Sequence, residues 1–269
     1  MKNLYIITTL ILFLSACTDK IDLKIQNSEP VLIVEAKIKS IEKELRVELS
    51  KSTEFDDTPN SPLWIANANV FVTINGEAEV EVPYTENGKY IIENILVDAG
   101  TKYNLRIVWG EKEYKSSSSM REIIPILDIK FAAAFRPGNN DEDGIPHEIQ
   151  MFVNPPLDST DYYFTRISIL DTFTNNWINE SYLQWNDEIY SKGPALFPYR
   201  ETFAIGDSLK VEFSHISKEV FEFYETLDDV KRQNPSSLAP MNPTSNISND
   251  AIGYFGAFKT YQKYIRVKP

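Results

Sequence analysis

Cys17 is the residue whose type and position point most directly to a chemical modification. It is the only cysteine in the 269 residues. A mostly apolar run from Leu4 to Leu14 precedes it, and the small residues Ser15 and Ala16 stand directly before it. Lys2 gives that run a basic start, so the segment predicts a bacterial lipoprotein signal, cut before Cys17 and lipidated on its thiol. A core cysteine behind an ordinary signal peptide is an alternative. A membrane anchor is another, but its run of about ten residues is shorter than the roughly 20 that a spanning helix needs.

The lipid predicted on Cys17, a palmitate-type acyl chain, is the covalent group that we expect, and we expect no other cofactor. Acyl chains hold a protein on a membrane without a spanning helix. We therefore expect an outer-membrane location, facing either the periplasm or the cell surface. Residues 1–16 would be the signal peptide and residues 17–29 a tether. Removal of residues 1–16 takes away Lys2 and changes the formal net charge from −12 to −13.

The side chains that most often carry catalysis are scarce. The two histidines, His147 and His215, do not lie in a His-Glu-x-x-His motif, and the sequence has no Gly-x-Ser-x-Gly elbow, P-loop or Gly-x-Gly-x-x-Gly. We expect both histidines to be structural or solvated, and we expect no enzymatic activity. An envelope hydrolase remains an alternative, because 39 acidic residues offer many pairs that could act as acid and base.

One acidic segment resembles the start of a calcium-binding loop. Asn139, Asp141 and Asp143 alternate before a glycine, and clustered oxygen ligands suit a hard cation. The twelfth position is Gln150 instead of a bidentate glutamate, and Pro146 interrupts the segment. We therefore expect an exposed acidic loop and no metal, with those three residues as a weak calcium candidate.

Aromatic residues gather between positions 177 and 199, in a region that shows no clear strand pattern and that we expect to be a loop. Exposed tryptophan and tyrosine rings bind partner proteins, and they also stack on sugars. Trp177, Tyr182, Trp185 and Tyr190 are therefore the hypothetical ligand or partner surface, and packing in the core is the alternative.

The composition is that of a folded acidic protein. Apolar residues make up 42% and aromatic residues 12%, and the isoelectric point is about 4.8. Nucleic acid and anionic lipid surfaces both require clustered cations, so neither is an expected partner. Without Cys17 no cysteine remains for disulfides or thiolate metal sites.

Short alternating segments in the first half predict a β-sandwich over residues 30–118. The pair Asn75-Gly76 predicts a tight hairpin between Asn69–Ile74 and Glu77–Val82, because both turn positions need positive φ. Ser116–Ser119 would be the joint to the second domain. The other predicted strands are Val31–Ile38, Leu45–Leu49, Gly88–Ile92, Gly100–Ile107 and one around Tyr114.

The second half, residues 120–269, predicts another β-rich domain that carries one amphipathic helix at about 217–233. Ser217 is the predicted N-cap, and Lys231 and Arg232 close the last turn. The apolar stripe consists of Val220, Phe221, Tyr224, Leu227 and Val230. The predicted strands are Ile126–Phe131, Glu148–Val153, Tyr162–Leu170, Leu209–Phe213 and Tyr261–Val267.

Several short motifs resemble a Bacteroidota lipoprotein family known as domain of unknown function 4249. The most specific are Asn242–Ile247 and Gly253–Ala257, and residues 248–251 stand where glycines are commoner. The segments Gly88–Tyr90 and Ala99–Leu105 are also similar to immunoglobulin-like modules found beside TonB-dependent receptors. Further matching segments are Pro30–Glu35, Ala68–Val72, Asp161–Tyr163, Asn186–Glu188 with Gly193, and Gly206-Asp207.

This resemblance implies a fold and a setting, without catalytic residues. It implies an N-terminal immunoglobulin-like β-sandwich and a mainly β protein in the cell envelope. It also implies a non-enzymatic accessory, or substrate-handling partner, of a TonB-dependent outer-membrane transporter. A free-standing surface lipoprotein that binds a glycan or peptide is the alternative. For the last motif we expect structural roles, with glycines at positive φ and Asn246 closing a turn.

Overall fold

Strands dominate the computed structural model, which describes residues 30–53, 61–133, 147–154, 160–187, 195–232 and 242–268. The prediction of a mainly β chain with one amphipathic helix is confirmed for these residues. Cys17, Tyr190 and the calcium candidates Asn139, Asp141 and Asp143 lie outside them. The elements are β1 (Leu32–Lys39), β2 (Glu44–Lys51), β3 (Leu63–Trp64), β4 (Asn69–Ile74), β5 (Val80–Glu81), β6 (Lys89–Glu93), β7 (Lys102–Trp109), β8 (Lys112–Ser119), β9 (Ile126–Ala133), β10 (His147–Val153), β11 (Tyr162–Asp171), β12 (Asn176–Asn186), β13 (Ala195–Phe203), β14 (Ser208–Ile216), α2 (Lys218–Arg232) and β15 (Ile252–Arg266).

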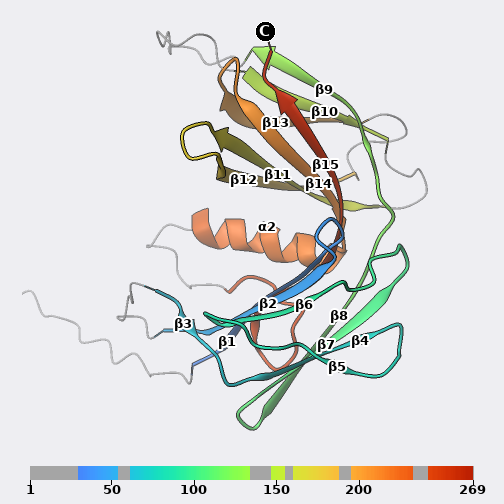
Figure 1. Ribbon diagram of the computed structural model, residues 1–269, viewed down its shortest axis with the longest axis vertical. Helices are drawn as coiled ribbons and strands as arrows, with labels where there is room; N and C mark the ends of the chain where they lie inside the picture. Colours follow the sequence, from blue (N-terminus) through green and yellow to red (C-terminus); the bar gives the residue numbers. More distant parts are fainter. Residues whose placement is uncertain are drawn as a thin grey trace, which may run out of the picture.

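The last strand, β15, joins the two halves of the chain in one sheet. Its first part pairs in parallel with β1, from Ile33 opposite Ile252 to Lys39 opposite Phe258. Its second part pairs antiparallel with β14. The resulting order is β12-β11-β14-β15-β1-β2-β3, with β6 also paired to β2, and Figure 1 shows this sheet curving through the whole molecule. The predicted division near residue 118 is therefore bridged by a strand that both halves share.

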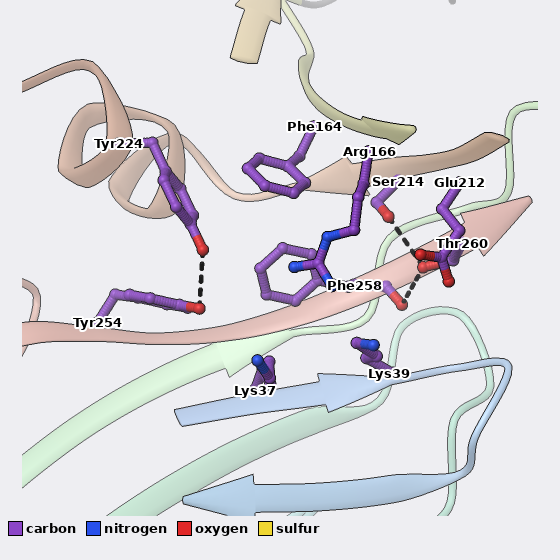
Figure 2. Close-up of a pocket in the computed structure, with 10 residues that line it drawn as sticks. All are labelled: Lys37, Lys39, Phe164, Arg166, Glu212, Ser214, Tyr224, Tyr254, Phe258 and Thr260. Carbon is purple, nitrogen blue, oxygen red and sulfur yellow. Dashed lines mark hydrogen bonds between the residues drawn. The ribbon is translucent and has the colours of Figure 1, made fainter. Parts of the chain in front are cut away.

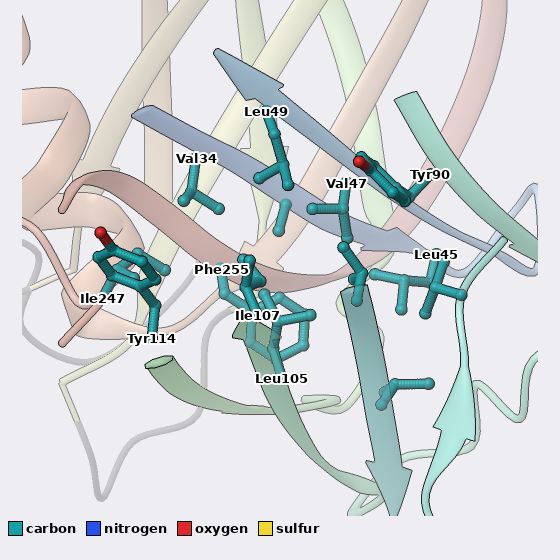
Figure 3. Close-up of a cluster of buried hydrophobic side chains, with 14 of the residues drawn as sticks. Val34, Leu45, Val47, Leu49, Tyr90, Leu105, Ile107, Tyr114, Ile247 and Phe255 are labelled. Atoms are coloured by element: carbon teal, nitrogen blue, oxygen red, sulfur yellow. The ribbon is translucent and has the colours of Figure 1, made fainter. Parts of the chain in front are cut away.

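Alternation along β15 places two cores on the same face of this long sheet. Phe255 and Ala257 belong to a core that the sheet β5-β4-β7-β8 covers, and Figure 3 shows Phe255 among its side chains. Tyr261 and Ile265, an even number of residues further on, pack against the core under the sheet β13-β10-β9. Residues of one strand with this spacing point the same way. Two sandwiches thus share one sheet, and both second layers lie on its outer, convex side (Figure 1).

The opposite, concave face of the long sheet carries α2. The helix begins at Lys218, directly after Ser217, whose carbonyl oxygen accepts the Phe221 N–H at 3.1 Å. Its apolar side packs on the alternate residues Tyr254 and Phe258 of β15, and Figure 1 shows it inside the curve of the sheet. The buried helix residues are Val220, Phe221, Phe223 and Tyr224. No helix within the described ranges is long and apolar enough to cross a membrane.

The family motif near the C-terminus is explained by backbone geometry and close packing. Gly253 has φ of +132°, and an added Cβ would overlap the Val34 carbonyl. Gly256 lacks positive φ, and it is small because a Cβ there would come within 2.6 Å of Val220 on α2. Asn249 and Asp250, where glycines are commoner, adopt φ of 58° each, a conformation that these two residue types tolerate.

The side chain of Asn246 acts differently from the prediction. Its amide nitrogen donates to the Phe255 carbonyl at 2.9 Å, and its amide oxygen accepts the Phe255 N–H at 2.9 Å. Asn246 therefore imitates a neighbouring strand nine residues away and does not close a local turn. This pairing attaches the segment before β15 to the start of that strand.

Three local predictions also need correction. The Asn75-Gly76 turn is confirmed by φ of 50° and 77°, but β5 is only two residues long and Val80 is exposed. Ser116–Ser119 lie in β8 and form no joint. The aromatic region that showed no strand pattern forms β12 and β13, because partner strands β11 and β10 supply the hydrogen bonds that select the extended conformation.

Candidate functional site

A cavity of about 350 Å³ lies on the concave face, beside α2. We call it the Lys37 cavity. Strands β1, β2 and β11 and the turn between β1 and β2 supply its lining, which consists of Lys37, Lys39, Glu42, Glu44, Arg46 and Arg166. A small void of about 20 Å³ adjoins it and shares Lys37, Lys39 and Arg166. Figure 2 shows these three cations directed toward aromatic rings from α2, β11 and β15.

Lys37 is the member of this lining with an unmatched charge. Its side chain is half-buried, and its ammonium has no hydrogen-bond or ion-pair partner within the described part of the chain. In the sheet it lies between Arg46 on β2 and Gly256 on β15. Like charges at directly opposite positions are destabilising, and Gly256 offers no side chain that could compensate.

Burial and two neighbouring cations act on Lys37 in the same direction. Removal from water lowers the pKa of Lys37 most, and the positive charges of Arg166 and Lys39 lower it further. Glu35 and Glu48 raise it, but by less. A perturbed lysine in a cavity is a functional-site candidate on physical grounds.

The neighbouring charges differ from Lys37 because they have partners. Lys39 Nζ lies 2.9 Å from Glu42 Oε1, and Arg46 Nε lies 2.9 Å from Glu44 Oε1. Arg166 stands opposite the buried Glu212 of β14, and its guanidinium lies 5.8 Å from the centre of the Phe164 ring. The two adjoining cavities are lined by four cations and three carboxylates, and Glu35 and Glu48 also act on Lys37 without lining either cavity.

Aromatic rings form the wall between the Lys37 cavity and α2. Tyr224 donates its hydroxyl hydrogen to the Tyr254 hydroxyl at 2.8 Å, and Phe164 packs on Tyr224 with ring centres 4.7 Å apart. Burial raises the pKa of Tyr224 to about 12 and that of Tyr254 well above its usual value. Both hydroxyls therefore stay neutral, and the wall combines apolar surface with hydroxyl groups (Figure 2).

Trp185 does not belong to an exposed surface, so that part of the sequence hypothesis is wrong. Its side chain is 9% exposed and stacks on Tyr163 with ring centres 4.3 Å apart. The indole Nε1 donates to Thr165 Oγ1 at 3.3 Å. Strand alternation places Trp185 on the convex face of β12, where the second core buries it.

Trp177 and Tyr182 lie in different surroundings along β12. Tyr182 is half-buried against α2, donates to Asp228 Oδ1 at 3.0 Å and accepts from Lys231 Nζ at 2.7 Å. Trp177 is near the hairpin end of β12, with its ring 5.5 Å from that of the exposed Tyr264. Trp177, Tyr182 and Trp185 therefore do not form one patch, and the hypothesis of an aromatic binding surface is left with Trp177 beside Tyr264.

A second group of ionisable side chains lies inside the second core. His215 Nε2 is 3.0 Å from Asp161 Oδ1, and His215 Nδ1 donates to the Glu122 carbonyl at 2.9 Å. Because a carbonyl oxygen can only accept, Nδ1 carries a proton. The contact between Nε2 and the carboxyl group then requires a second proton, either on Nε2 or on the carboxyl oxygen. Asp187 accepts the Asp161 N–H at 2.8 Å and the Tyr163 hydroxyl at 3.3 Å. Burial raises the pKa of Asp187. Neither aspartate lines the Lys37 cavity.

A family model described as a domain of unknown function, DUF4249, matches residues 18–264. The chain belongs to the DUF4249 family. A search of curated proteins finds no match. The Lys37 cavity of this DUF4249 protein was not among the sequence-predicted sites, because Lys37 and Lys39 alternate with Ala36 and Ile38 in the way that solvated residues of a strand do.

The chemistry that the Lys37 cavity supports is binding by charge and by aromatic contact. Among the described residues, no three His, Cys, Asp or Glu side chains are arranged to hold a metal. His215, the histidine whose side chain the structure describes, is buried away from the cavity. Six charged side chains line the cavity of about 350 Å³ in this DUF4249 protein, and aromatic rings line the small void beside it, so the arrangement suits a polar ligand with a charged group.

Proposed function

We propose that this DUF4249 protein is a non-enzymatic, lipid-anchored envelope protein that handles a ligand for a TonB-dependent outer-membrane transporter. The observation that carries the proposal is the Lys37 cavity, in which an unmatched ammonium faces a space of about 350 Å³. That volume lies within the range of small-molecule sites, roughly 300–1,000 Å³. The charged side chains that line this space suit recognition, since they can hold a polar ligand by charge-assisted hydrogen bonds.

The setting of the proposal comes from the sequence. The signal that ends at Cys17 supports lipidation and anchoring in the outer membrane. Family membership supports an envelope role, and the resemblance to modules beside TonB-dependent receptors supports a transporter as partner. The shared strand β15 makes the two sandwiches one body, so ligand and transporter contacts on either half would be mechanically linked.

Purification of the tagged, full-length protein from gently solubilised outer membranes tests this function. We expect a TonB-dependent barrel to be recovered in stoichiometric amount, as identified by mass spectrometry. The control is Cys17→Ser, which removes the lipid and should reduce recovery from the membrane fraction. Recovery of the lipoprotein alone, together with unchanged nutrient uptake in a deletion strain, would contradict the proposal.

A free-standing binder of glycans is a second candidate, and Trp177 favours it. Its ring lies 5.5 Å from that of Tyr264, and Lys210 Nζ lies 5.5 Å from the centre of the indole ring. Partly exposed rings of this kind stack on the apolar faces of sugars. Calorimetric titration with a glycan panel should then show binding, and Trp177→Ala should abolish it. Phe173→Ala is the control, because Phe173 is an aromatic residue that is 97% exposed, and it should leave binding unchanged. Equal heats in all three proteins would exclude this site.

A further inference from the structure

We propose that the Lys37 cavity binds one carboxylate group of its ligand, held between the Lys37 ammonium and the Arg166 guanidinium. The inference deepens the proposed function and depends on it, because it names the chemical class that the cavity takes. Both cations line both adjoining voids, and they come from strands β1 and β11. Figure 2 shows the two side chains approaching the same space from opposite sides.

Lys37 has a charge without a partner in a half-buried position, where an unpaired charge is destabilising. Buried or half-buried charges are normally paired, because removal from water disfavours the charged form. Lys39 and Arg46 follow that rule, each with a carboxylate oxygen at 2.9 Å. Lys37 has no such partner in the described ranges and stands opposite Arg46. A bound anion would supply the missing partner.

The charges around Lys37 bear on which anion it can hold. The lining provides four cations and three carboxylates, Glu42, Glu44 and Glu212, and Glu35 and Glu48 add negative charge that also acts on Lys37. This surrounding negative charge favours a ligand group with one negative charge over a phosphate group, which has up to two. A carboxylate also matches the planar fork of an arginine.

The groups around the two cations limit what the remainder of the ligand can be. Phe164 and Phe258 offer apolar ring surface, and Tyr224, Tyr254 and Thr260 offer hydroxyl groups next to the cations. The void that these residues line is about 20 Å³, room for no more than a water-sized group. The adjoining space of about 350 Å³, which is lined by six charged side chains, takes the larger part, and this part of the ligand must therefore be polar. The cavity therefore suits a small organic acid, or a carboxylate-bearing end of a sugar or peptide.

Titration with simple salts tests the inference without knowledge of the natural ligand. The mature protein is titrated with sodium acetate, sodium phosphate or sodium chloride at equal ionic strength, and amide chemical shifts are followed by NMR. We expect acetate to shift resonances of β1 and β11 in a saturable manner, with tighter binding than for phosphate or chloride. Lys37→Met should weaken acetate binding at least tenfold. Lys102→Met, at an exposed lysine on β7, should leave it unchanged.

A second variant keeps the test valid if Lys37→Met perturbs the fold. Arg166→Lys retains the charge and removes the fork, so we expect acetate binding to weaken while the spectrum of the free protein stays native-like. Equal effects of all three salts, tighter phosphate binding, or identical acetate binding in wild type and Lys37→Met would each overturn the inference. The proposed function is tested separately, because recovery of the transporter does not depend on the anion that the cavity takes.

Discussion

The long sheet holds two groups of buried or half-buried ionisable side chains, on opposite faces, and they differ in how their polar atoms are satisfied. On the convex face, Asp161, His215 and Asp187 bond to one another's side chains or backbone and to nearby groups inside the second core. On the concave face, Lys37 has no partner among the described residues and faces a cavity.

This difference separates a structural network from a candidate binding site. A buried polar network that is fully satisfied specifies one packing arrangement, and losing a member leaves an unpaired group behind. An unmatched charge beside a cavity does not stabilise the free protein, and a perturbed ionisable group in such a place is a candidate for a role in binding. The two groups should therefore respond in opposite ways to removal of a charge.

Asp161→Ala should give the largest loss of stability. It would leave the His215 ring nitrogen without its acceptor in a core where both residues are about 5% exposed or less. Breaking a buried pair by removing one partner typically costs 3–5 kcal/mol. Urea unfolding followed by fluorescence should show a free energy of unfolding lower by about that amount. A loss below about 1 kcal/mol would mean that the network is not structural.

Gly256→Ala should have the next largest effect, because it separates α2 from the sheet. The added Cβ would come within 2.6 Å of Val220 Cγ2, and overpacking of this kind costs about 1–3 kcal/mol. Since α2 supplies Tyr224 to the cavity wall, acetate binding should weaken as well. Thermal unfolding and the acetate titration measure the two effects. Lower stability with unchanged binding would show that the helix does not form the wall of the functional site.

Trp177→Ala should destabilise the protein less than either change. The ring is half-buried and its contact with Tyr264 is an aromatic pair, worth about 0.5–1.5 kcal/mol. Trp185→Ala is the matched comparison on the same strand, and removal of a core tryptophan typically costs 3–5 kcal/mol. Chemical denaturation of both variants should reproduce this order. Equal losses would place Trp177 in the core and contradict its half-buried position.

Lys37→Met should give the smallest change, with the opposite sign. Because the folded state disfavours the charged lysine, we expect stability to be unchanged or higher by up to about 1 kcal/mol. The pKa of Lys37 is lowered from its usual 10.5, so the folded state binds fewer protons than the unfolded state between the lowered pKa and 10.5.

The free energy of unfolding of the wild type therefore rises with pH between the lowered pKa of Lys37 and 10.5. The difference in stability between Lys37→Met and the wild type becomes smaller over the same pH range. Unfolding of both proteins from pH 7 upward checks the sign. The groups that face Lys37 and must be counted are Glu35, Lys39, Arg46, Glu48, Arg166, Glu212, Tyr224 and Tyr254. A destabilised Lys37→Met at all pH values would make Lys37 a structural residue.

Local patterns predicted much of the fold. Alternation identified the strands now seen as β1, β2 and β7, and the capping and stripe residues located α2 to within one residue at each end. The Asn75-Gly76 turn was likewise predictable, since positive φ is a local property. The parallel pairing of β15 with β1 was not, because it joins residues more than 200 positions apart and no local signal encodes the partner.

The candidate site could not be predicted for the same reason. Lys37 and Arg166 lie 129 positions apart, and Lys37 alternates with apolar residues on its own strand as a solvated residue would. Only the curvature of the shared sheet and the position of α2 turn this face into a cavity. The burial of Trp185 was equally hidden, because its ring is exposed or buried according to whether β13 and β10 cover that face.

The most direct test of the account is the titration of Lys37 itself, by NMR of ¹³Cε-labelled lysine in the mature protein, with and without sodium acetate. The account predicts that the pKa of Lys37 lies below those of the other lysines in the free protein. It also predicts that acetate raises it, because a bound carboxylate favours the charged form. A Lys37 resonance that titrates with the exposed lysines and does not respond to acetate would contradict the assignment of this cavity as a binding site.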